Sequence, residues 1–174
     1  MDATSANPTG DKATCLRAME IMTAGTVDDF AEVYAPDALD READDHPPLR
    51  GPQGLYRSAV RLREAFADMH WEVHRAVQDG DLVVLHTTMS GRQQGTLTAY
   101  GPDGAVRAVF PSRGRTFAVT QTHWFRMDGG LIAEHWANRD DMTMGRQLGW
   151  IPPTPGYIVK MVRARRQAQR AAKV

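Results

Sequence analysis

The chain has 174 residues, 21 basic and 21 acidic side chains, and a net charge of zero at pH 7. This is the length of one domain, and the balanced charge argues against nucleic acid or an anionic membrane as the main partner. One cysteine excludes an internal disulfide, and no apolar run approaches the roughly 20 residues that span a bilayer. We therefore expect a cytoplasmic protein that binds a small molecule. Residues 1–11 lack the pattern of a signal peptide and are expected to be a flexible leader.

Two short helices are predicted near the N-terminus. Apolar residues recur on one side of residues 12–24, and Gly25 ends this first helix. Thr26, with Asp29 three residues later, has the spacing of a capping box, which opens a second helix that stops before Pro36.

A third helix is predicted after an acidic segment. Residues 36–51 show no periodicity and are expected to form a loop. Pro52 suits a first helical position, and one apolar stripe follows it into the core. The stripe consists of Leu55, Ala59, Leu62, Phe66 and Met69.

After residue 70 the apolar period changes to two, which is typical of strands. We expect strands over residues 71–78, 82–90, 95–100, 106–110, 115–127 and 131–138. Helices followed by an antiparallel meander indicate an α+β domain in which helices cover one side of a curved sheet and enclose a cavity. We expect this domain to span residues 12–150.

The segment 121–150 holds the polar residues best placed for chemistry, because a hairpin fixes its cross-strand neighbours. A three-residue loop at 128–130 would place His123 opposite His135. A tighter turn would place His123 opposite Glu134, since a slip of one residue turns every side chain to the other face. In either register His123 has a titratable neighbour.

These neighbours make His123, His135 and Glu134 candidate catalytic groups for proton transfer. The alternative is that both histidines only hydrogen-bond within the sheet. Asp140 is a further catalytic candidate, although a carboxylate directly before the helix at 142–148 also suits an N-cap.

Several other residues are expected to line the cavity. The loop residue His46 is a candidate for its mouth, together with Asp44 and Asp45, although a loop histidine is also an ordinary surface residue. The six histidines form no familiar ligand motif, so no metal site is expected. The expected lining residues in the strands are Gln121, Phe125, Trp136, Asn138, His86 and Met89.

The segment also resembles a known family. A histidine before the hairpin, the turn Asp128-Gly129-Gly130, the run EHWANRDD and a closing RQLG are similar to the SnoaL-like proteins. These form the polyketide cyclase or predicted ester cyclase branch of the nuclear transport factor 2-like fold. The similarity extends weakly over about residues 15–149. It implies a cone-shaped α+β barrel, with N-terminal helices packed on a curved antiparallel sheet, often dimeric through that sheet, which binds a hydrophobic small molecule without a cofactor.

The resemblance also implies site residues. In polyketide cyclases of this kind an aspartate and a histidine support an intramolecular aldol closure. His123 matches the histidine, but the aspartate position is held by Ala137, which cannot move a proton. Asp40 stands where relatives often have a polar cavity residue, and Gln93 where many have histidine.

Two functions follow from these observations. The first is a cofactor-free enzyme that cyclises, isomerises, hydrates or dehydrates a hydrophobic, oxygenated molecule by acid/base catalysis. The second, favoured by Ala137, is a non-catalytic binding or accessory protein.

Residues 151–174 have a different character. They are expected to be a proline-rich segment and a basic helix that docks through Tyr157, Ile158 and Val162. We expect this helix to be a solvated tail; the alternative is contact with nucleic acid, against which the balanced net charge argues.

Overall fold

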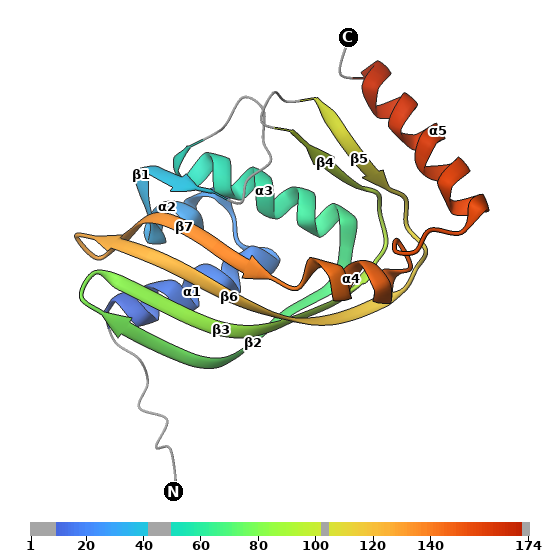
Figure 1. Ribbon diagram of the computed structural model, residues 1–174. Coiled ribbons are helices and arrows are strands. Elements are labelled where there is room, and N and C mark those ends of the chain that lie inside the picture. Colours follow the sequence, from blue (N-terminus) through green and yellow to red (C-terminus); the bar gives the residue numbers. More distant parts are fainter. Residues whose placement is uncertain (1–9, 42–49, 102–104, 172–174) are drawn as a thin grey trace, which may run out of the picture.

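A computed structural model describes residues 10–41, 50–101 and 105–171 of the chain (Figure 1). Three helices precede most of the strands, as the sequence predicts, and two more follow them. Within the described residues, no helix is both long and apolar enough to cross a membrane. The helices are α1 Asp11–Ala24, α2 Val27–Val33, α3 Gly51–Ala65, α4 Asp141–Leu148 and α5 Pro155–Ala171.

The strands form two sheets rather than the single sheet that we predicted. A five-stranded sheet has the order β1-β7-β6-β3-β2, with β1 parallel to β7 and all other pairs antiparallel. The short strands β4 and β5 form a separate two-stranded sheet and, among the described residues, pair only with each other. The strands are β1 Tyr34–Asp40, β2 Phe66–Asp79, β3 Leu82–Gln93, β4 Leu97–Tyr100, β5 Val106–Phe110, β6 Thr116–Asp128 and β7 Leu131–Arg139.

The first two helices follow from their local sequence. The capping box predicted for α2 is present: the Thr26 backbone N–H donates to the Asp29 carboxylate at 2.7 Å, and the Thr26 hydroxyl accepts from the Asp29 N–H. In α1, the sulfur atoms of Cys15 and Met127 lie 3.5 Å apart, so this helix packs directly against β6. The apolar side of α1 therefore becomes part of the core.

Two predictions about the N-terminal third were wrong. The segment after α2 is a strand, β1, and not a loop, because it pairs along the edge of β7 with an irregular register between Tyr34 and Leu39. The third helix ends at Ala65, so that Phe66 and Met69 belong to β2. A local irregularity of β2, with Asp68 at a φ of 55°, follows this junction.

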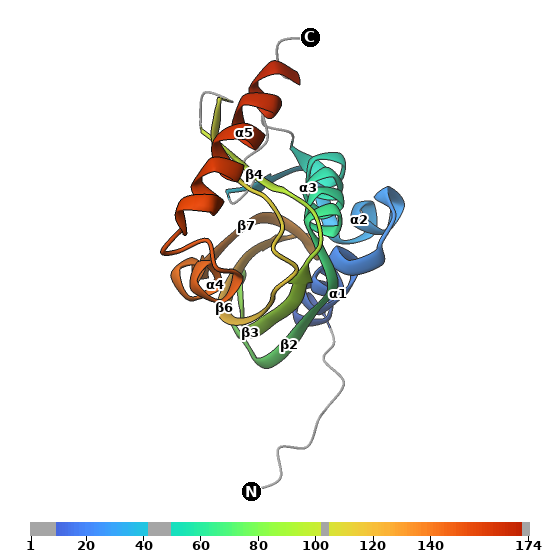
Figure 2. The ribbon, with the colours of Figure 1, turned by 90° about the vertical axis from the view of Figure 1, so that its right-hand side faces the viewer.

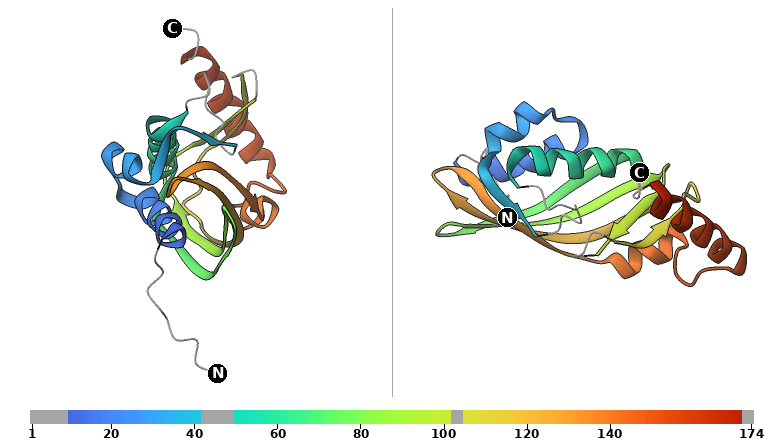
Figure 3. Two further views of the ribbon diagram at one scale, coloured as in Figure 1. Left: turned by 90° about the vertical axis from the view of Figure 1, so that its left-hand side faces the viewer. Right: turned by 90° about the horizontal axis from the view of Figure 1, so that it is seen from above.

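Helices α1, α2 and α3 lie on one side of the curved five-stranded sheet, and their buried side chains pack on its inner face (Figures 2 and 3). The opposite end of the molecule holds α4 and α5 (Figure 3). There α5 lies against β5 through the buried Tyr157, whose hydroxyl donates to the Pro111 carbonyl at 3.0 Å. Ile158 and Val162 are 46% and 45% exposed, so the prediction that they dock α5 was wrong.

Candidate active site

The β6–β7 hairpin has neither of the two registers that we predicted. Gly129 and Gly130 form the turn, and an irregularity at Ala133 then adds one residue to β7. As a result, His123 lies opposite Ala137, whereas His135 lies opposite Phe125. Both predicted partners of His123 in the strand pairing, His135 and Glu134, were therefore wrong.

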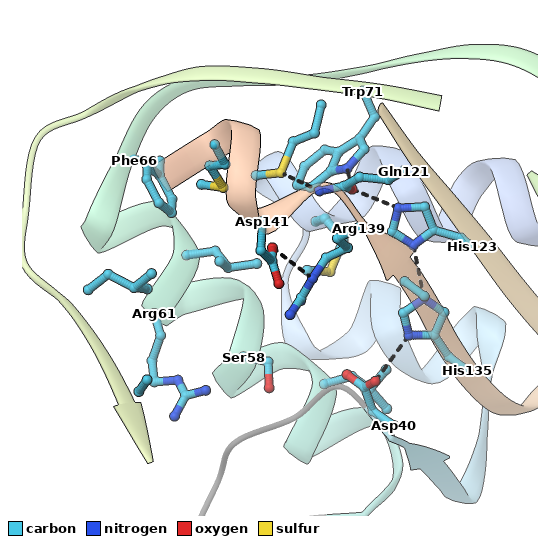
Figure 4. A pocket seen from close by; sticks show the side chains of 18 of the residues that line it. Asp40, Ser58, Arg61, Phe66, Trp71, Gln121, His123, His135, Arg139 and Asp141 are labelled. Carbon is cyan, nitrogen blue, oxygen red and sulfur yellow. Dashed lines mark hydrogen bonds and ion pairs between the residues drawn. The ribbon is translucent and has the colours of Figure 1, made fainter. Parts of the chain in front are cut away.

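The extra residue in β7 is a β-bulge, and it nevertheless turns one row of β7 side chains towards the inner face of the sheet. A cavity of about 580 Å³ lies between the sheet and α3, within the range that encloses a drug-sized ligand. Its other walls are largely apolar and include Trp71, Met89 and Phe125. The hairpin residues that line the cavity are Gln121, His123 and Phe125 on β6, and His135, Ala137 and Arg139 on β7. Figure 4 labels four of them, Gln121, His123, His135 and Arg139.

A continuous chain of hydrogen bonds runs along this row (Figure 4). Asp40 Oδ1 lies 3.0 Å from His135 Nδ1, and His135 Nε2 lies 3.0 Å from His123 Nδ1. His123 Nε2 is in turn 2.9 Å from Gln121 Oε1, which also accepts from Trp71 Nε1 at 3.1 Å. The two histidines thus meet on a diagonal between the strands, although they are not paired in register.

The Trp71 indole at one end of this hydrogen-bond chain determines where the protons of the chain lie. The indole of Trp71 can only donate, so the atom of Gln121 that faces it must be the carbonyl oxygen. His123 Nε2 faces the same oxygen and must therefore carry a hydrogen. If His123 is neutral, its Nδ1 accepts from His135 Nε2, and one remaining proton is shared between His135 Nδ1 and Asp40.

The environment of His123 keeps this imidazole neutral. Its side chain is only 6% exposed. Burial, followed by the nearby charges of His135 and Arg139, lowers the pKa of His123 from 6.5 to about 3, and Asp40 offsets only part of this effect. The proton that can move is consequently held at the Asp40 end of the chain.

This pKa predicts an acid-sensitive fold. Below pH 6.5 the unfolded chain protonates His123 more readily than the folded chain does, so stability falls as the pH falls from 6.5 towards 3. At about 1.4 kcal/mol per pH unit, we expect the loss between pH 6.5 and 4 to be roughly 3 kcal/mol larger in the wild type than in His123→Gln. Urea unfolding at several pH values measures the free energy of unfolding of both proteins. If this free energy falls equally with pH in the wild type and in His123→Gln, the low pKa of His123 is contradicted.

Two predicted catalytic residues lie outside the cavity. Glu134 faces the outer side of β7, where it pairs with Arg41 and Arg126. Asp140 is the N-cap of α4, and its carboxylate accepts from the Thr143 N–H at 2.9 Å. Glu134 was predicted wrongly because the bulge turns it outward, and Asp140 because its carboxylate caps α4 instead.

Four predicted lining residues do not line the cavity either. Trp136 stacks on Trp124 on the outer face, and Asn138 accepts from the Trp124 indole at 3.1 Å. His86 is exposed on the same outer face. Gln93 is fully buried, and its amide binds the carbonyls of Gly95 and Phe110 and the indole of Trp150. The loop candidates Asp44, Asp45 and His46 lie outside the described residues.

The structure also brings in residues that the sequence analysis did not select. Trp71 faces the cavity because side chains alternate between the two faces of β2. The period-two pattern in the sequence could have predicted this orientation. The inward orientation of Arg139 depends on the bulge at Ala133, whose position the sequence does not show. Among the described residues, no three side chains of the metal-binding types are grouped so that they could hold an ion.

Comparisons with known proteins agree with this architecture. Residues 13–148 match the family described as SnoaL-like polyketide cyclase. The chain is 31% identical over 141 residues to the aklanonic acid methyl ester cyclase DnrD of Streptomyces peucetius, which covers 80% of this chain and 90% of that protein. It is also 31% identical over 141 residues to the aklanonic acid methyl ester cyclase DauD of Streptomyces sp. (strain C5), covering 80% and 81% of the two chains.

Solved structures show the same fold. TsrD from Streptomyces laurentii is 26% identical, with a TM-score of 0.62 over 79% of this chain and 96% of that chain. A SnoaL-like polyketide cyclase from Agrobacterium tumefaciens superposes with a TM-score of 0.62 over 82% of this chain and all of the other, at 15% identity. The predicted α+β barrel with helices on a curved sheet is thus confirmed.

Proposed function

The chain belongs to the SnoaL-like polyketide cyclase family, and from this premise we propose that it is a cofactor-independent enzyme acting on a hydrophobic, oxygenated substrate. Catalysis is by proton transfer within the cavity. One observation carries the proposal: the hydrogen-bonded pair of Asp40 and His135 supplies the wall of the cavity with a carboxylate. Ala137, two residues after His135 on β7, has none. The absence of an acid at position 137 therefore does not leave the cavity without a base.

The Asp40 carboxylate suits the role of base. It lines the cavity, and the hydrogen bond from His135 holds its orientation. In an aldol closure, Asp40 takes the proton from a carbon beside a carbonyl group. The electron pair left on that carbon forms the new carbon–carbon bond to a second carbonyl, and the proton returns from the Asp40–His135 pair to the resulting alkoxide. Substrate and product are isomers, so no further reactant is required.

His123 has a different role in this scheme. Both of its ring nitrogens are engaged, one with His135 and one with Gln121, and its low pKa makes it a poor proton acceptor near neutral pH. We assign it as a positioning residue, which holds the ring of His135 towards Asp40. Proton transfer itself is assigned to Asp40 and His135.

The names of the relatives supply a first substrate to test. DnrD is an aklanonic acid methyl ester cyclase, and we propose a polycyclic polyketide of this kind for the present chain. Incubation of the purified protein with aklanonic acid methyl ester, followed by chromatography and mass spectrometry, should reveal a product of unchanged mass and altered retention. If this ester and related polyketides bind and are returned unaltered, the protein is a binding or accessory protein instead.

We also propose a homodimer, as the resemblance implies, formed through the outer face of the sheet. This face carries the stacked rings of Trp124 and Trp136, 6.1 Å apart. Aromatic side chains are enriched in protein interfaces. Light scattering coupled to size-exclusion chromatography should give twice the chain mass, and Trp124→Glu should reduce it to one chain. A monomeric wild type would refute this arrangement.

A further inference from the structure

Positive charge is concentrated at one end of the molecule. Residues 142–174 contain seven basic side chains and no acidic one, whereas α2, at the opposite end, has three acidic side chains and no basic one (Figure 3). The net charge of zero is therefore an average over two ends of opposite sign, and it does not describe the surface that a partner meets at either end. Five of the basic side chains lie on α5 and are exposed: Lys160, Arg163, Arg165, Arg166 and Arg170.

The same helix exposes apolar side chains. Its inner side packs on β5 through the buried Tyr157. Ile158, Val159 and Val162 are 46%, 49% and 45% exposed. Residues four apart share one side of a helix, so Arg166 continues the row that Ile158 and Val162 begin. The exposed surface of α5 is thus apolar near its start and basic towards its end. We call it the outer face of α5; its residues are Ile158, Val159, Val162, Arg163, Arg166 and Arg170.

The size of this face favours a lipid surface over a protein partner. α5 is the outermost of the described elements at its end of the molecule, so a flat surface can reach its whole length (Figures 1 and 3). Its 17 residues form a helix about 25 Å long and about 10 Å wide, which presents on the order of 250 Å². A stable protein interface buries about 800 Å² on each partner. A bilayer has no such requirement, because apolar side chains enter the boundary of its acyl chains while basic side chains bind anionic headgroups.

We propose that the outer face of α5 docks on a bilayer that contains anionic lipids. Ile158, Val159 and Val162 enter the layer between headgroups and acyl chains, and the arginines bind lipid phosphates. Ile151 lines the cavity and is 40% exposed, so the cavity wall reaches the surface four residues before α5 begins. A hydrophobic substrate dissolved in the bilayer would then lie close to the cavity. Only this route for the substrate rests on the proposed function; the docking does not depend on it.

Sedimentation of the full chain with sucrose-loaded vesicles tests the docking. Two compositions are compared: phosphatidylcholine alone, and phosphatidylcholine with about 30% phosphatidylglycerol, which supplies the negative surface potential. We expect the partition coefficient of the wild type to be at least about tenfold higher for the anionic vesicles. It should fall several-fold as the salt concentration is raised from about 0.05 M to about 0.5 M, because salt screens exposed charges.

Two pairs of variants test whether the outer face of α5 is the part that binds. Arg166→Glu should lower the partition coefficient for anionic vesicles by about tenfold or more, since each basic residue near the surface contributes a gain of about fivefold. Arg75→Glu makes the same change of charge at an exposed position of β2 and should have little effect. Val162→Ser should weaken binding about threefold by removing apolar contact. Val77→Ser, at a β2 side chain that is 57% exposed, should leave it unchanged.

Three results would overturn the docking. The first is equal binding of the wild type to the two kinds of vesicle, and the second is an equal loss of binding in Arg166→Glu and Arg75→Glu. The third is no binding to anionic vesicles; if the wild type then binds a DNA duplex with a steep dependence on salt, α5 contacts nucleic acid instead.

These measurements are made without substrate and are independent of turnover. A protein that docks on anionic vesicles but alters no polyketide keeps the docking and loses the proposed function. A protein that turns over its substrate but does not bind the vesicles loses only the docking.

Discussion

Replacement of Asp40 by asparagine is expected to lower kcat by about 10²- to 10⁴-fold, the usual contribution of a positioned acid/base group. Asparagine retains an oxygen that can accept the hydrogen bond from His135 but cannot take a proton from carbon. The dissociation constant of the substrate should therefore change by no more than about threefold, since the shape of the cavity is kept. Steady-state kinetics and fluorescence titration measure the two quantities separately.

The chain offers a matched control for this variant. Asp140→Asn makes the same chemical change at the N-cap of α4, and asparagine caps helices as well as aspartate does. Turnover and thermal stability should both stay near the wild-type values. If Asp40→Asn turns over at the wild-type rate, Asp40 is not the base, and the catalytic role of the hydrogen-bond chain must be abandoned.

Replacement of Gly51 by alanine is expected to destabilise the fold by more than about 3 kcal/mol. Gly51 begins α3 at a φ of +69°, which alanine rarely adopts, and an added Cβ would lie 2.2 Å from the carbonyl oxygen of Pro36 on β1. The backbone of β1 or of α3 must shift to relieve this overlap. The free energy of unfolding in urea measures the effect, and a circular dichroism spectrum shows whether the variant folds.

Gly156 in α5 provides the comparison for Gly51. Apart from its chain neighbours and the backbone of α5 itself, no described atom lies within 4 Å of a Cβ added there, and alanine favours a helix more than glycine does. Gly156→Ala should therefore leave the unfolding midpoint unchanged or raise it slightly. Equal stability of the two alanine variants would show that the contact between Gly51 and Pro36 is not tight.

Much of the fold could be predicted from local patterns. The period-two alternation after residue 70 predicted six strands, and the capping box predicted the start of α2. β1 could not be found in this way, because it contains Pro36 and pairs with β7, which lies about a hundred residues later in the chain. What makes this segment a strand is a distant partner rather than its own composition.

The site was predictable only up to the bulge in β7. The alternation of β6 places Gln121, His123 and Phe125 on one face, and that face does line the cavity. On β7 the extra residue at Ala133 places His135 and Arg139 on the inner face, which agrees with one of the two registers left open by the sequence and excludes the other, in which Glu134 faces His123. Glu134 therefore faces outward and Arg139 inward. The position of a bulge depends on how two strands settle against the core, which a single sequence does not reveal.

The separate pairing of β4 and β5 has a consequence for how such a protein changes over evolutionary time. These strands form one wall of the cavity, yet within the part of the chain that the structure describes no backbone ladder joins them to the five strands that carry Asp40, His123 and His135. Insertions or substitutions in this wall, or in α5 behind it, can reshape the space for a ligand without disturbing the register of the proton-carrying residues. Such a lineage can acquire new substrates while it keeps its chemistry.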